Sequence, residues 1–129
     1  MTLHAALITL LNVILISVAM YFVARARGIH RVMAPTVVGH PDFERAFRAH
    51  QNTLEQTVMF LPTLWVATAF GNPTYAAWLG YAWLLGRAWY LFGYLRATEK
   101  RSAGFLVAAI AWTGLLLVAL TGLVPKLLA

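Results

Sequence analysis

Polar side chains recur at helical spacing in two mostly apolar stretches of this 129-residue chain. The members of the first stripe are separated by three, four and three residues: Arg45, Arg48, Asn52 and Glu55. The members of the second stripe are separated by three, four and seven residues: Arg87, Tyr90, Tyr94 and Arg101. Such spacings place the side chains of each stripe on one helical face.

Together the two stripes predict a positively charged, hydrogen-bonding pocket. Several guanidinium groups suit a ligand with more than one carboxylate, because arginine binds a carboxylate through two parallel hydrogen bonds. Asn52 and Glu55 suit an amino group on the same ligand. A small zwitterion with excess negative charge fits this set, and a phosphate headgroup is the competing ligand.

Each stripe also has a structural interpretation. The first stripe is compatible with the solvated end of a helix, although Asn52 and Glu55 stand next to an apolar run. Tyr90 and Tyr94 are compatible with an aromatic belt at the membrane interface. Arg87 is compatible with an ion pair to Glu55, yet an arginine deep in an apolar run is a functional candidate.

The remaining reactive residue types predict little chemistry. The chain has no cysteine, which excludes a disulfide framework and a thiolate nucleophile. The four histidines show no metal-ligand spacing, so we expect no metal: His4, His30, His40 and His50. His50 lies off the first stripe and is expected at the pocket edge. The five tryptophans are interpreted as packing residues.

Composition indicates that lipid is the solvent for much of the chain. Hydrophobic residues make up 61% and charged residues 11%, against about 25% charged in a typical soluble domain. Because a membrane-spanning helix needs about 20 apolar residues, we predict an all-α, integral membrane four-helix bundle in a single domain, residues 1–129. The expected helices cover residues 3–24, 42–70, 74–97 and 102–124.

Local signals set these boundaries. Asp42 suits a helix start, either as the N-cap or as an acid in the first turn, and Gly71-Asn72-Pro73 is a turn signal. Pro62 is expected to bend the second helix rather than end it, whereas Pro125 is expected to close the fourth. A cleaved signal peptide is the alternative for the first segment, but that segment has no preceding basic residue and is longer than usual.

Basic residues predict the orientation in the membrane. They gather between the first and second helices and between the third and fourth, with none between the second and third. The positive-inside rule then places the first and third connections in the cytoplasm and both termini outside. The formal charge of +6 is thus attributed to topology and an anion site rather than to nucleic acid.

Two segments resemble the signatures of a known family. FERAFRAHQNTLE at 43–55 and GRAWYLFGYLRATEKR at 86–101 are similar to motifs of MAPEG, the membrane-associated proteins in eicosanoid and glutathione metabolism. The similarity is greatest to leukotriene C synthase and to microsomal glutathione S-transferases of types two and three. It covers the second and third helices and the following connection, while the first and fourth helices match only as apolar segments.

The resemblance implies a homotrimer that binds glutathione between neighbouring subunits and takes a lipophilic second substrate from the bilayer. It also assigns roles by position. Arg101 would hold and activate the glutathione thiol, because a nearby guanidinium favours the thiolate. The implied glutathione-binding residues are Arg27, Arg48, His50, Asn52, Glu55, Arg87, Tyr90 and Tyr94.

Four positions depart from the leukotriene C synthase pattern: Gly28, His50, Gln56 and Pro62. These differences weaken the expectation of leukotriene synthesis but leave the arginine, asparagine and glutamate of the second helix in place. Short connections favour a bacterial inner-membrane protein. We therefore predict a glutathione transferase for hydrophobic electrophiles, with lipid hydroperoxide reduction as a second activity. The alternatives are a non-catalytic lipid-binding member of the family and a purely structural membrane protein.

Overall fold

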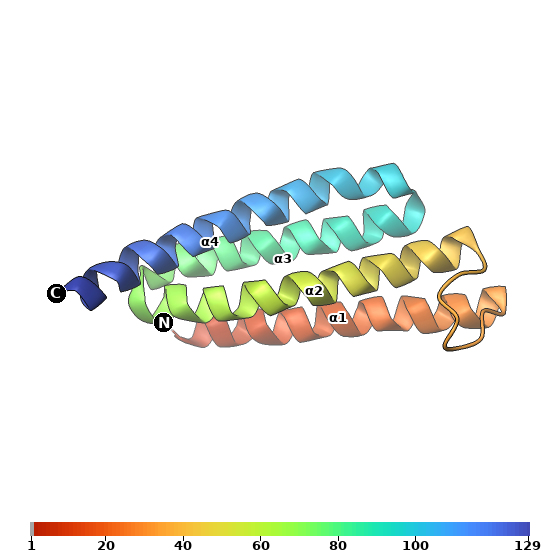
Figure 1. Ribbon diagram of the computed structural model, residues 1–129, viewed down its shortest axis with the longest axis horizontal. Coiled ribbons are helices and arrows are strands. Elements are labelled where there is room, and N and C mark those ends of the chain that lie inside the picture. Colours follow the sequence, from red (N-terminus) through yellow and green to blue (C-terminus); the bar gives the residue numbers. More distant parts are fainter. Residues whose placement is uncertain (1) are drawn as a thin grey trace.

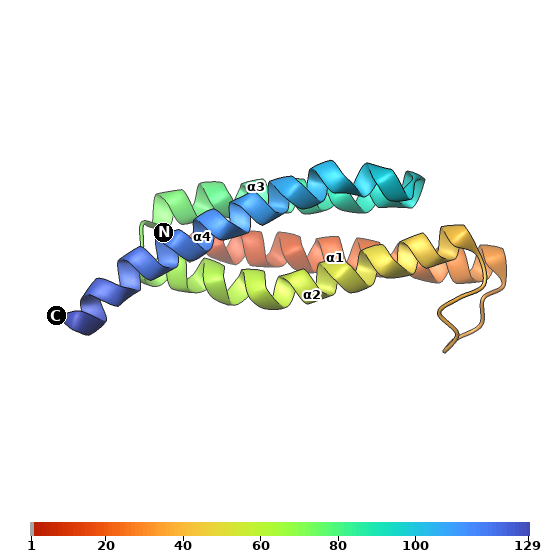
Figure 2. The same ribbon diagram turned by 45° about the horizontal axis from the view of Figure 1, so that its top comes forward.

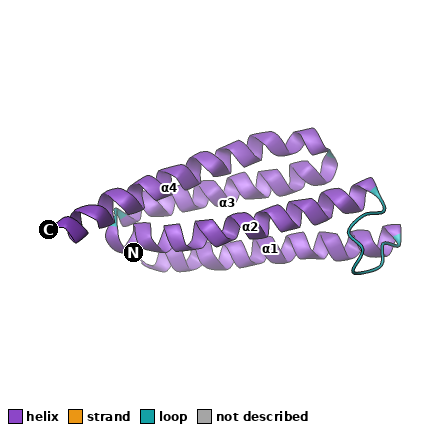
Figure 3. Cartoon of the chain, in the orientation of Figure 1, coloured by secondary structure: helices purple, strands orange, loops and turns teal. Residues whose placement is uncertain are grey.

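The computed structural model describes residues 2–129 as four long helices packed side by side (Figure 1). They are α1 (Thr2–His30), α2 (Pro41–Phe70), α3 (Pro73–Arg96) and α4 (Ser102–Leu128), with a short 3₁₀ helix, η1 (Thr98–Arg101), before α4. No strand occurs in the described part of the chain (Figure 3). The predicted all-α, four-helix architecture is confirmed.

Connections and chain ends lie at opposite ends of the bundle. The α1–α2 connection and η1 share one end, while both ends of the chain and the α2–α3 turn lie at the other (Figure 1). The last turns of α4 extend beyond the other helices (Figure 2). The basic residues flanking the first and third connections are therefore gathered at one end of the molecule.

Helices α1 and α4 are longer than predicted. α1 continues past residue 24 to His30 and ends where Arg31 adopts a left-handed conformation, φ 55°, a common way to terminate a helix. α4 continues past residue 124 to Leu128 with Pro125 inside it, so Pro125 does not close the helix. α2 passes through Pro62 without ending.

Capping side chains define the starts of α2 and α3. His40, rather than Asp42, is the N-cap of α2, and its side chain accepts a hydrogen bond from the Asp42 backbone nitrogen at 3.1 Å. Asp42 lies in the first turn, where a negative charge favours the helix dipole. Asn72 caps α3 by accepting from the backbone nitrogens of Thr74 and Tyr75. The Gly71-Asn72-Pro73 signal predicted a turn here but not this capping role.

The core lies between the four helices and is closed by aromatic and aliphatic packing. The Phe60 and Trp83 rings stack with centroids 3.7 Å apart, joining α2 to α3. Asn12 is fully buried in α1 and donates to the Thr57 hydroxyl of α2 at 3.3 Å. This polar contact satisfies an amide that would be costly to bury alone.

Small residues bring α3 and α4 into close contact. A Cβ added at Gly104 would lie 2.3 Å from the Tyr90 backbone nitrogen, and one at Gly86 would lie 2.7 Å from the Ala108 backbone nitrogen. Small residues at helix crossings permit such approach in membrane proteins. The contact fixes the start of α4 against the face of α3 that carries Tyr90.

Membrane-spanning character is not equal among the helices. α1 and the segment 98–128 are long and apolar enough to cross a membrane, with mean hydropathies of 2.4 and 2.3. α2 and α3 are not apolar enough to be identified as spans by mean hydropathy. α2 has a polar first half, and α3 carries an arginine and many aromatic residues. Hydropathy alone therefore identifies two of the four predicted spans.

Candidate functional site

A cleft of about 710 Å³ opens between α2, α3 and the start of α4. It brings together six residues that the two stripes predicted: Arg48, Asn52, Glu55, Tyr90, Tyr94 and Arg101. It also contains four residues that the sequence interpretation missed: Gln51, Ser102, Phe105 and Leu106. The predicted meeting of the two stripes is thus observed, and the fourth helix adds an apolar wall.

The cleft has a charged rim and an aromatic floor. Arg48, Glu55 and Arg101 are exposed, whereas Tyr90 and Tyr94 are buried. The two tyrosine rings meet edge to face with centroids 5.6 Å apart. The Arg101 guanidinium lies 5.1 Å from the centre of the Tyr94 ring, a cation–π contact. Two guanidiniums against one carboxylate leave the rim positively charged.

Arg87 lies behind the cleft rather than in its lining. Its side chain is 1% exposed, and Nη2 donates to Asn52 Oδ1 at 2.9 Å and to Thr53 Oγ1 at 2.7 Å. The guanidinium also lies 4.0 Å from the centre of the Tyr90 ring. Arg87 therefore contacts Asn52 and Tyr90 from behind the cleft lining, and its predicted role in binding the ligand stays a prediction.

No ion pair joins Arg87 to Glu55 among the described residues, which removes the simplest structural interpretation of the arginine. Neutral oxygens of α2 accept from it instead. Thr53 was missed from the sequence because a threonine within an apolar helix usually bonds to its own backbone. Its position one residue after Asn52 is the signal that would have identified it.

Arg27 and His50 line another cavity of the same chain and do not reach the cleft from within it. Their predicted part in a glutathione site between neighbouring subunits stays a prediction. Both line a hollow of about 540 Å³ between α1 and α2, with Ser17, Tyr21 and Phe47. Arg27 Nη1 donates to the Thr36 carbonyl oxygen at 2.8 Å. The angular offset that separates His50 from Asn52 on α2 turns it to a different face.

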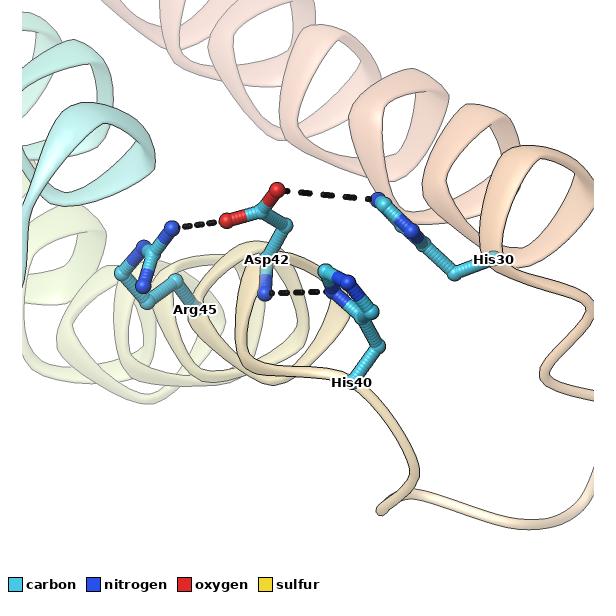
Figure 4. Close-up of polar contacts among 4 residues, drawn as sticks. All are labelled: His30, His40, Asp42 and Arg45. Atoms are coloured by element: carbon cyan, nitrogen blue, oxygen red, sulfur yellow. Dashed lines mark hydrogen bonds and ion pairs between the residues drawn. The ribbon is translucent and has the colours of Figure 1, made fainter.

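Arg45, the first member of the first stripe, does not line the cleft. It forms an ion pair with Asp42 at the start of α2 (Figure 4). Beside this pair, the His30 and His40 rings stack with centroids 3.7 Å apart. Ligand-type atoms of His30, His40 and Asp42 lie within 4.8 Å of one another, a grouping that sequence spacing did not predict because the connection 31–39 separates the two histidines.

A family model described as the MAPEG family matches residues 5–121. This chain belongs to the MAPEG family, whose members are membrane-embedded helical proteins. The resemblance drawn from the motifs at 43–55 and 86–101 is confirmed.

Curated relatives of this chain support the same family assignment. An uncharacterized protein of Synechocystis is 47% identical over 106 residues, covering 82% of this chain and 77% of that protein. Mouse microsomal glutathione S-transferase 2 is 40% identical over 106 residues, covering 82% and 72%. Guinea pig (Cavia porcellus) leukotriene C4 synthase is 40% identical over 123 residues, covering 95% and 82%.

Proposed function

We propose that this MAPEG protein is a membrane-bound transferase that conjugates glutathione to lipophilic electrophiles. The cleft between α2, α3 and α4 carries the proposal, because it combines two arginines, a carboxylate, two amides and two tyrosines with apolar Phe105 and Leu106. Relatives named microsomal glutathione S-transferase 2 and leukotriene C4 synthase support it.

Glutathione matches the charges of the cleft. It carries two carboxylates and one ammonium group, and the cleft offers two guanidiniums, one carboxylate and two side-chain amides. We assign Arg48 to a glutathione carboxylate, because arginine binds carboxylates in bidentate fashion. Asn52 and Glu55 then accept from the ammonium group. Tyr90 and Tyr94 form the floor on which the peptide lies.

Arg101 is the proposed activating residue. A guanidinium next to the sulfur favours the thiolate over the thiol. The thiol releases its proton to water, and the thiolate attacks an electrophilic carbon. A carbon–sulfur bond forms as the bond to the leaving group breaks, and the leaving group departs with the electron pair. With a lipid hydroperoxide, two glutathione thiols would instead be oxidised to a disulfide while the peroxide is reduced to an alcohol and water.

A homotrimer is part of the proposal. The cleft and the Arg27–His50 cavity share no residue, so one chain presents two different surfaces, one polar and one mostly apolar. Head-to-tail contacts between unlike surfaces generate a closed ring when the rotation between subunits closes, and we propose a rotation that closes after three subunits. In such a ring the Arg27 and His50 of one subunit would face the cleft of its neighbour and complete the glutathione site.

We place all four helices in the bilayer, with the α1–α2 connection and η1 on the cytoplasmic side. Many large apolar side chains on the outer faces of α1 and α4 are exposed, including Leu10 at 62% and Ile110 at 63%. Surface of this kind is compatible with lipid contact. The electrophile would reach Phe105 and Leu106 from the bilayer.

The deciding experiment measures conjugation of chlorodinitrobenzene by the purified full-length protein in detergent. We expect glutathione-dependent turnover in the wild type and about a hundredfold lower kcat/KM in Arg101→Ala. Arg31→Ala, which removes an exposed cation at the same end of the bundle, should keep the activity. Absence of glutathione-dependent turnover in the wild type would refute the proposal.

The non-catalytic alternative is tested with the same preparation. Glutathione that binds the folded protein should raise its melting temperature by mass action. Tight lipid binding together with an unchanged melting temperature in saturating glutathione would instead identify a lipid-binding protein.

A further inference from the structure

A second arginine-rich cavity, of about 370 Å³, lies at the connection end of the bundle between α1, α2 and α3. Each helix contributes one arginine to it: Arg25, Arg45 and Arg96. Asp42 and His30 are its other polar residues. It shares no residue with the proposed glutathione cleft.

Positive charge in this cavity is poorly compensated. Asp42 pairs with Arg45 and lies 3.8 Å from His30 Nε2. Among the described residues, Arg25 and Arg96 have no ion-pair partner. The Arg45 Nε is buried without a hydrogen-bond acceptor. Three guanidiniums against one carboxylate repel one another, and an anion would relieve that repulsion.

The cluster of His30, His40 and Asp42 beside the cavity does not make the cavity a better site for a metal ion than for an anion. His40 Nδ1 already accepts from the Asp42 backbone nitrogen, and Arg45 already holds the Asp42 carboxylate (Figure 4). A metal ion would have to replace these contacts and sit beside three guanidiniums, which is electrostatically unfavourable. The cavity is therefore built for an anion rather than a cation.

Apolar side chains line the rest of the cavity. Phe22, Ile29 and Leu95 form its wall, and Ile29 is also exposed at the protein surface. A ligand that matches both parts has an anionic head and an apolar body. This combination argues for an amphiphile over a small soluble anion.

We propose that this cavity binds the phosphate of an anionic membrane phospholipid, with Arg25, Arg45 and Arg96 around the phosphate and the start of the acyl chains against Phe22 and Leu95. Guanidinium groups bind phosphate oxygens through paired hydrogen bonds. Basic cavities between transmembrane helices are suited to lipid headgroups. The positive end of the α2 dipole adds to the attraction.

The test is native mass spectrometry of the full-length protein extracted from bilayers containing equal amounts of phosphatidylglycerol and phosphatidylcholine. Wild type should retain phosphatidylglycerol preferentially. The double variant Arg25→Gln/Arg96→Gln should retain about tenfold less, the change expected when paired contacts to a phosphate are lost. Both positions are exposed, so the variant should fold, which circular dichroism verifies.

The matched control is Arg31→Gln/Lys100→Gln, which removes two exposed positive charges at the same end but outside this cavity. It should keep wild-type retention. Equal loss in both double variants would overturn the proposal, since it would reduce the effect to general surface charge. Equal retention of the two lipids by wild type would also overturn it.

A soluble phosphate source is examined in lipid-free detergent. Inorganic phosphate should raise the melting temperature of wild type no more than that of Arg25→Gln/Arg96→Gln. A wild-type-specific rise that matches the effect of added phosphatidylglycerol would overturn the assignment to phospholipid. None of these readouts requires transferase activity, so the outcome is independent of the proposed reaction.

Discussion

Two arginine-rich cavities in one small bundle differ in what accompanies the positive charge. The larger cleft surrounds Arg48 and Arg101 with a carboxylate, two amides and two tyrosines. The smaller cavity surrounds Arg25, Arg45 and Arg96 with apolar side chains and one carboxylate already paired to Arg45. Guanidinium groups alone thus do not define a ligand. The neighbouring acceptors distinguish a zwitterionic peptide from an anionic amphiphile.

The two cavities also differ in how they are held together. The cleft depends on α4 lying against α3, with Gly104 next to the backbone of Tyr90. The smaller cavity involves only α1, α2 and α3. A substitution that disturbs the helix contacts around one cavity should therefore leave the other cavity intact.

The largest effect is expected from Gly104→Val. A Cβ at this position would lie 2.3 Å from the Tyr90 backbone nitrogen, so α3 and α4 must separate. Overpacking of this kind costs about 3 kcal/mol. Denaturation of the protein in detergent should show that loss together with the loss of glutathione binding. Gly28→Val is the control, because no atom lies within 4 Å of the added Cβ, and an equal loss there would contradict the prediction.

Arg101→Ala should lower kcat/KM for conjugation about a hundredfold, the scale of removing one group that stabilises a developing or reacting anion. The ultraviolet absorbance of bound thiolate at neutral pH should fall with it. Arg101→Lys keeps the charge and should restore part of both signals. Retention of phosphatidylglycerol should not change, because Arg101 does not line the smaller cavity.

Arg48→Gln and Arg96→Gln should each change a different quantity, because Arg48 lines the cleft and Arg96 lines the smaller cavity. Arg48→Gln removes a carboxylate contact and should raise the KM for glutathione about tenfold while leaving phospholipid retention unchanged. Arg96→Gln should lower retention and leave the KM unchanged. Enzyme kinetics and native mass spectrometry on the same preparations measure both. If either variant changed both quantities equally, the two cavities would not be independent sites.

A smaller effect is expected from Glu55→Gln, which removes the carboxylate assigned to the glutathione ammonium group. The affinity for glutathione should fall about fivefold, corresponding to about 1 kcal/mol for a solvent-exposed ion pair. A glutathione analogue without the amino group should bind the wild type and Glu55→Gln equally well. Calorimetric titration of both ligands checks this. An equal fall in affinity for the analogue would assign Glu55 a different role.

The number of helices, their order and one of the two cavities could be predicted because they depend on local signals. Apolar run lengths set the four helices, and the spacing of Arg48, Asn52 and Glu55 set one face of α2. The end of α1 could not be predicted in the same way. The segment from Arg25 to His30 is polar enough to suggest a connection, yet it continues the helix, and Phe22, Ala26 and Ile29 line the cavity between α1, α2 and α3.

The sequence by itself determined the helical class and the residue types available for chemistry, because helical periodicity is a local property. Only the tertiary structure decided which polar residues share a cavity. It placed Arg87 behind Asn52, moved Arg27 and His50 to another face, and joined Arg25, Arg45 and Arg96 from three helices. The physical reason is that spacing fixes the angle of a side chain about its own helix axis, whereas packing fixes which neighbour that angle faces.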